Sequence, residues 1–245
     1  MHLFFEALGY IVGVIVYLRN RANETVTEQQ RATVLTGAAL GAAIGARLLV
    51  GFQGKTIVGG LLGGLIGVEI AKLAAGIVQS TGDRFVYPLI TAIAIGRIGC
   101  FLMGPADKTA GLPTNLPWGI AMGDPVKRHP VALYEIAFLI VLGFVIQWRI
   151  GAPACPSPHL DRRGRLSSTG DRFRVFLMSY LAFRFFEDFL KPEPPPILFG
   201  LTAIQIACAL GVLYYVLVFS NDERSAAVPF LRRRRVDLHD VLSED

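Results

Sequence analysis

Three arginines lie inside apolar stretches of this sequence, and they are the residues whose chemistry most needs an explanation. They are Arg47, Arg97 and Arg184. A guanidinium in a membrane segment is costly unless it pairs with something anionic, so such a residue marks a functional site by default. Its planar fork of donors matches carboxylate and phosphate oxygens. The three arginines therefore predict an anion-binding site.

The elements that must position them are predicted to be membrane helices. Hydrophobic residues make up 53% of the 245 residues, and apolar runs of about twenty residues recur. The fold class predicted is an all-α, polytopic integral membrane protein with seven transmembrane helices. The first run lacks a basic start and a small-residue cleavage site, so it is interpreted as a retained helix. The seven spans are expected at residues 3–18, 34–53, 56–78, 85–103, 131–148, 173–190 and 197–219.

The distribution of Lys and Arg sets the orientation. With the N-terminus outside, the inner segments hold fourteen of these residues and the outer segments five. The sequence therefore predicts an outside N-terminus and a cytoplasmic C-terminus, and the net charge of +5 requires no nucleic-acid partner. We expect a membrane domain over residues 1–220 with an outer loop at 104–130. A cytoplasmic linker at 151–168 and a cytoplasmic tail at 221–245 complete the organisation.

This topology brings ionisable residues to one membrane level. Spans 2, 4 and 6 run outward and span 5 runs inward, which places five of them near the outer face: Arg47, Arg97, Glu135, Arg184 and Asp188. His129 lies in the outer loop above them. Three guanidiniums against two carboxylates would leave net positive charge, which suits a phospholipid headgroup. The alternative is that these residues form structural ion pairs between helices.

Glycines at four-residue spacing dominate two of the spans. Gly37, Gly41 and Gly45 lie in the second span, and a matching series, Gly59, Gly63 and Gly67, lies in the third. Small residues at this spacing let helices approach closely in lipid, so a close helix pair is predicted.

Several short motifs resemble a known family, the prolipoprotein diacylglyceryl transferases. In chain order they are Gly45-Ala46-Arg47, Gly63-Gly64-Leu65-Ile66-Gly67, Gly96-Arg97-Ile98-Gly99-Cys100-Phe101, Gly111-Leu112-Pro113-Thr114, Pro117-Trp118-Gly119, Arg128-His129-Pro130, Leu133-Tyr134-Glu135, Phe183-Arg184, Asp188-Phe189 and Gly200-Leu201-Thr202 with Gln205. The likeness extends over nearly the whole chain. It implies a bacterial inner-membrane enzyme that transfers diacylglyceryl from phosphatidylglycerol to the lipobox cysteine thiol of a prolipoprotein. Glycerol 1-phosphate is released, and no cofactor or metal is implied.

The resemblance also implies roles for individual residues. Arg97 and Arg184 would bind the phosphate and stabilise its developing charge, and Arg47, Glu135 and Asp188 would complete the substrate site. The chain departs from the family pattern at Leu62, where the family has histidine, and at Cys100 and Met103, where it has asparagine. Asp188 replaces a glutamate and Lys191 an arginine.

The departures leave the proton acceptor and the acceptor substrate open. Since Leu62 cannot take a proton, the base for the thiol is expected to be His129 or Asp107 at the outer mouth, unless the thiol ionises by itself. Two alternatives to the lipoprotein reaction stay open: a related transferase with another acceptor, and a non-catalytic phospholipid-binding membrane protein. A transporter is weaker, because no broken-helix repeat is visible.

Overall fold

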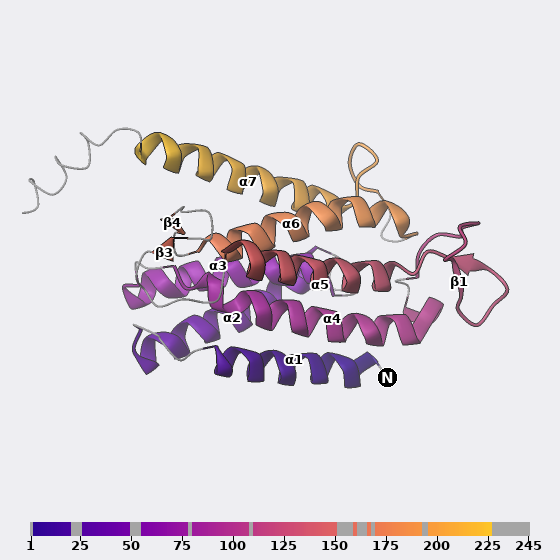
Figure 1. Cartoon of the computed structure of the whole chain (residues 1–245), viewed down its shortest axis with the longest axis horizontal. Coiled ribbons are helices and arrows are strands. Elements are labelled where there is room, and N and C mark those ends of the chain that lie inside the picture. The colour runs from indigo at the N-terminus through magenta and orange to yellow at the C-terminus, as the bar shows by residue number, and fades with distance from the viewer. Residues whose placement is uncertain are drawn as a thin grey trace, which may run out of the picture.

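The computed structural model describes residues 2–20, 26–49, 55–77, 80–107, 110–150, 159–160, 166–167, 170–192 and 196–226. Seven α helices form across these residues: α1 (His2–Arg19), α2 (Glu28–Leu48), α3 (Ile57–Ala75), α4 (Val86–Met103), α5 (Val131–Ile150), α6 (Asp171–Glu187) and α7 (Ala203–Ala226). They lie side by side along the long axis of the molecule, with α1 and α7 on opposite flanks (Figure 1). Each predicted span overlaps one of these helices. The predicted helical class is therefore confirmed.

Three of the segments described are long and apolar enough to cross a membrane. They are Ile57–Ala75, Gly82–Ala106 and Val131–Arg149, and Ala203–Leu217 is a shorter apolar helix. Helices α2 and α6 carry more polar residues; α6, for example, contains Asp171, three arginines and Glu187. Large apolar side chains nevertheless cover the outside, such as Leu73 and Phe144. An outward apolar surface of this kind is typical of helices that face lipid.

Helices α2 and α3 form the close pair that the glycine spacing predicts. A Cβ atom added at Gly41 would lie 2.2 Å from the backbone oxygen of Gly63, and one added at Gly67 would lie 2.0 Å from that of Gly37. At this separation no side chain fits between the backbones, so dispersion contacts run along the whole interface.

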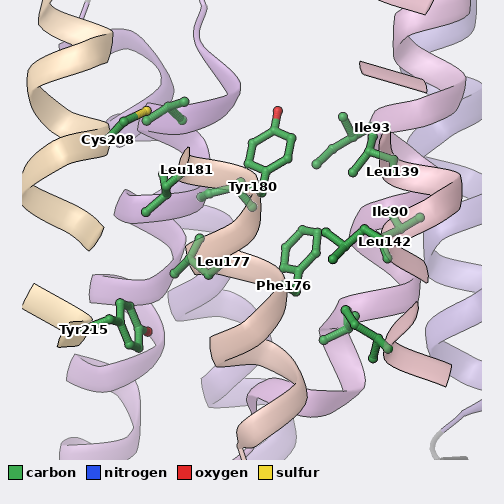
Figure 2. Close-up of a cluster of buried hydrophobic side chains, with 14 of the residues drawn as sticks. Ile90, Ile93, Leu139, Leu142, Phe176, Leu177, Tyr180, Leu181, Cys208 and Tyr215 are labelled. Carbon is green, nitrogen blue, oxygen red and sulfur yellow. The ribbon is translucent and has the colours of Figure 1, made fainter. Parts of the chain in front are cut away.

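Helix α6 is the centre of the hydrophobic core. Figure 2 shows Phe176 and Tyr180 on the side of α6 that faces α4 and α5, and Leu177 and Leu181 on the side that faces α7. All four of these side chains are fully buried. The core therefore fixes the rotation of α6 about its axis, and with it the direction of the charged residues near its end.

Two helix starts differ from the predicted spans. Helix α2 begins at Glu28, six residues before the predicted span, because Thr27 and Gln30 form a reciprocal capping box. Helix α7 begins at Ala203 and not at residue 197. Residues 197–201 instead fold back in a tight turn with Gly200 at a φ of 75°, and the Thr202 hydroxyl caps the helix by accepting from Gln205 N.

A short hairpin stands at the end of the molecule where α4 ends and α5 begins. Its strands are β1 (Ile120–Ala121) and β2 (Lys127–Arg128), paired antiparallel, and three short 3-10 helices lie at helix ends: η1 (Gly82–Phe85), η2 (Gly104–Asp107) and η3 (Asp188–Leu190). The N-terminus lies at the same end as this hairpin (Figure 1).

The predicted linker and tail fall largely outside the described residues. Within 151–168 the structure describes β3 (His159–Leu160) and β4 (Leu166–Ser167), which pair antiparallel. The predicted tail begins inside α7, which continues to Ala226, and residues 227–245 lie outside the described part.

Candidate functional site: a buried charge cluster

Arg97 and Glu135 form an ion pair between α4 and α5. The Arg97 Nε atom lies 2.7 Å from Glu135 Oε2, and both side chains are at least nine-tenths buried. Arg97 lies two turns before the end of α4 and Glu135 in the first turn or two of α5, so the antiparallel helices bring them to one level. The Tyr180 hydroxyl of α6 donates to the other carboxylate oxygen of Glu135 at 2.6 Å.

Arg184, on the last turn of α6, joins the same group of charges. Its Nη1 lies 3.6 Å from Glu135 Oε2 and also pairs with Glu187, one turn along the helix. Its Nη2 lies 3.9 Å from Asp188 Oδ1. Four of the five residues predicted to converge are thus brought together, by α4, α5 and the end of α6.

Lys191 and the segment before α7 close the cluster. Lys191 Nζ lies 3.3 Å from Glu187 Oε2, and the Thr202 hydroxyl donates to Asp188. Burial lowers the pKa of Lys191 well below its usual 10.5, and the positive charges of Arg184 and Arg97 lower it further. The six buried residues form what we term the charge cluster: Arg97, Glu135, Arg184, Glu187, Asp188 and Lys191.

Two parts of the predicted site are corrected by this geometry. Arg47 is not one of the buried charges, because its side chain is exposed on the last turn of α2. The expected excess of positive charge is also wrong for the buried group, since Glu187 and Lys191 belong to it. Three cations face three carboxylates, and the charge cluster is formally neutral when all six groups are ionised.

The charge cluster does not satisfy all of its own hydrogen-bonding groups. Among the described residues, Arg184 Nε is buried and has no hydrogen-bond partner. The same is true of Glu187 Oε1 and Asp188 Oδ1. Buried polar groups are almost always satisfied in folded proteins, so the Arg184 Nε donor is free to bind an acceptor oxygen of a ligand.

Cys100 lies beside Arg97 in a small pocket. The Arg97 Nη1 donates to Cys100 Sγ at 3.7 Å. The pocket lies between the end of α4, the outer loop and the start of α5, and it is lined by Cys100, Phe101, Gly104, Ala110, Met122, Val131 and Ala132. Its lining is almost entirely apolar.

His129 lies in the loop against Tyr134, the residue before Glu135. The ring Nδ1 is 3.3 Å from the Tyr134 hydroxyl, which also accepts from Trp118 Nε1 at 2.8 Å. The backbone of His129 is fixed by hydrogen bonds with Gly111 and Leu112. The ring is half-buried. Its catalytic role stays a prediction.

Two other positions bear on proton transfer: Asp107, the second candidate base, and Leu62, where the family has histidine. Asp107 ends η2, and its side chain lies outside the described part. Leu62 packs against the hydrophobic core, near Gly211 of α7. An apolar residue fits these neighbours, and Leu62 cannot itself accept a proton.

Sequence reasoning missed Tyr180 and Glu187. A signal was present: Tyr180, Arg184, Glu187 and Lys191 follow spacings of four, three and four residues, which places them on one face of a helix. Arg184 and Asp188, which the sequence places at one level, are also four residues apart, and the same spacing extends in both directions to Tyr180, Glu187 and Lys191.

Helices with lipid-type outer faces and a buried arginine–carboxylate cluster define a membrane protein with a charge cluster near one end of the bundle. The comparison with known proteins agrees with this class. The family model for prolipoprotein diacylglyceryl transferase matches residues 3–220. The chain therefore belongs to the prolipoprotein diacylglyceryl transferase family.

Three curated relatives illustrate the similarity, and each is named phosphatidylglycerol–prolipoprotein diacylglyceryl transferase. The protein of Cupriavidus metallidurans is 36% identical over 159 residues, which are 63% of this chain and 52% of the relative. That of Cupriavidus pinatubonensis is 35% identical over 186 residues, covering 70% and 61%. That of Oleidesulfovibrio alaskensis is 33% identical over 187 residues, covering 71% and 64%. The chain thus spans about half to two thirds of the length of these relatives.

Proposed function

We propose that this protein transfers the diacylglyceryl group of phosphatidylglycerol to the lipobox cysteine thiol of prolipoproteins. The observation that carries the proposal is the convergence of Arg97 and Arg184 on Glu135, with buried guanidinium donors left unused. The family and the names of the relatives give this anion site its substrate.

The orientation that suits this reaction is the one that the charges favour. We propose seven spans in the bacterial inner membrane, with the N-terminus outside and the C-terminus in the cytoplasm. The helices coincide with the seven apolar runs, and the N-terminus and the 104–130 loop share one end of the bundle, as that topology requires (Figure 1). The charge cluster would then face the outer leaflet, where secreted precursors emerge.

The proposed chemistry is displacement at the glycerol carbon that bears the phosphate. The acceptor sulfur attacks this carbon, the C–O bond breaks, and its electron pair remains on the phosphate oxygen of glycerol 1-phosphate. Arg97 and Arg184 would donate hydrogen bonds to the phosphate as its charge grows, which stabilises the transition state. Glu135 holds both guanidiniums in place, and Asp188, fixed by Thr202, orients Arg184.

The loop residues would serve the acceptor. The thiol must lose its proton because the thiolate is the nucleophile, and we propose His129 as the base, with Asp107 as the second candidate. Arg47, exposed near the end of α2, would contact the headgroup of a lipid outside the charge cluster.

A non-catalytic phospholipid-binding protein is the second candidate function. The specific observation in its favour is Leu62, which packs in the core and leaves no proton acceptor there. A transferase with another acceptor would keep the phosphate site and would differ only in the loop residues that contact the acceptor.

Complementation tests the proposal directly. The chain is expressed in a bacterium depleted of its own prolipoprotein diacylglyceryl transferase, and the lipidation of a reporter lipoprotein is measured. Rescue by the wild type, and none by the Arg97→Lys and Arg184→Lys variants at equal membrane abundance, is the expected result. Transfer to no lipoprotein, together with intact phosphatidylglycerol binding, would support the non-catalytic alternative.

A further inference from the structure

The electrical neutrality of the charge cluster raises a problem for anion binding. Three cationic and three anionic side chains, each at least nine-tenths buried, leave no excess positive charge to receive a ligand. A phosphodiester headgroup carries one negative charge. An uncompensated charge in a buried, low-dielectric environment is strongly unfavourable. Ionisable groups nearby therefore gain or lose a proton so that the net charge is cancelled.

The contacts indicate which carboxylate would lose most of its hydrogen-bonding and ion-pair partners when Arg184 turns from the carboxylates to a bound phosphate. Glu135 would keep Arg97 and the Tyr180 hydroxyl, and Asp188 would keep the Thr202 hydroxyl.

Glu187 would keep only its contact with Lys191, among the contacts that the structure describes. Its Oε1 atom, moreover, is already buried without a hydrogen-bond partner in this part of the chain. Of the three carboxylates, Glu187 is therefore the one least able to remain ionised once Arg184 is engaged.

We propose that the Glu187–Lys191 pair takes up one proton when an anionic phosphodiester headgroup binds to Arg97 and Arg184. This inference rests on the proposed function, which places the headgroup there. With the added proton, the cluster carries one net positive charge that matches the bound phosphate. Glu187 holds the added proton as glutamic acid, beside the Lys191 ammonium. The ionisable groups that face the pair are Arg184 from α6, which contacts Glu187 directly, and Arg97 from α4, Glu135 from α5 and Asp188 from η3, whose charges act on Lys191.

Proton uptake makes headgroup binding depend on pH in a defined direction. Because the complex holds one more proton than the free protein, affinity should fall about tenfold per pH unit while the pH lies between the pKa of the pair in the free protein and its higher pKa in the complex. A zwitterionic headgroup brings no net charge, so it should cause no proton uptake. Proton uptake by the Glu187–Lys191 pair would thus favour the binding of anionic over zwitterionic phospholipids.

Calorimetric titration measures the proton directly. The full chain in detergent micelles is titrated with dioctanoyl-phosphatidylglycerol at about pH 7 in buffers of different ionisation enthalpy, and the slope of the observed heat against that enthalpy gives the number of protons bound. We expect about one for the wild type and about zero for Glu187→Gln, whose cluster already has a net positive charge. The matched control is Glu69→Gln, which also removes a glutamate paired with a lysine on its own helix, here Lys72 on the exposed surface of α3.

The outcomes separate this inference from the proposed function. Phosphatidylglycerol binding by the wild type with no proton uptake overturns the inference and leaves the proposed function intact, and this holds even if Glu187→Gln fails to fold. Uptake of one proton by a folded Glu187→Gln variant also overturns it. Absence of phosphatidylglycerol binding at every pH, together with absence of lipid transfer, overturns both.

Discussion

Replacing Arg97 by lysine separates phosphate recognition from simple charge pairing. The Arg97 guanidinium contacts Glu135 through Nε and Cys100 through Nη1, and these contacts leave N–H donors on the same rigid group for a ligand. A lysine ammonium keeps the charge and can still reach one partner, but it cannot present a planar fork to Glu135 and a phosphate at once.

The expected loss follows from the donors removed. One or two hydrogen bonds to a charged phosphate, each contributing about 1.5–3 kcal/mol, would be lost or misaligned in the transition state. Allowing for partial replacement by the ammonium, kcat/KM should fall by about 2–4 kcal/mol in transition-state stabilisation, or roughly thirty- to a thousandfold. Arg149→Lys, at an exposed site on the last turn of α5, is the control and should stay within about threefold of wild type.

Transfer of labelled diacylglyceryl from phosphatidylglycerol to a lipobox peptide provides the assay. Purified variants are compared at equal amounts of folded protein, with helical content and thermal unfolding measured in parallel. An Arg97→Lys variant that folds normally and transfers lipid within about threefold of wild type would refute the phosphate-binding role. A variant that loses folding along with activity would instead favour the structural ion pair.

Three further predictions concern other parts of the molecule. Gly41→Ala should destabilise the α2–α3 pair because its Cβ would lie 2.2 Å from Gly63 O, whereas Gly60→Ala, with its nearest neighbour at 3.7 Å, should have little effect; thermal unfolding in detergent compares them. His129→Gln should lower the transfer rate across the pH–rate profile, and an unchanged rate would favour self-ionisation of the thiol. The hydrogen bond from Arg128 lowers the pKa of Asp124, so the Asp124 carboxylate stabilises the hairpin above about pH 4 and that contribution is lost as the pH falls through the lowered pKa. Hydrogen exchange of the hairpin amides should show this acid loss in the wild type and not in Asp124→Asn.

Sequence alone determined the helical class, the close α2–α3 pair and most of the buried charges. It could do so because apolar length and four-residue glycine spacing are local patterns with direct physical meaning in lipid. Because α4 and α5 are antiparallel neighbours, Arg97 near the end of α4 and Glu135 near the start of α5 lie at the same level. For the same reason Arg184 and Asp188, one turn apart, were predicted to lie together.

Only the tertiary structure decided which charges are inside. Arg47 and Arg97 look alike in sequence, since each lies near the end of an apolar helix, but the rotation of each helix is set by distant packing partners. The glycine contacts with α3 leave Arg47 exposed, whereas the Phe176 and Tyr180 side of α6 faces the α4–α5 pair and brings Arg184 and Glu187 to Arg97 and Glu135. The neutrality of the charge cluster depends on this rotation, and no local pattern in the sequence contains it.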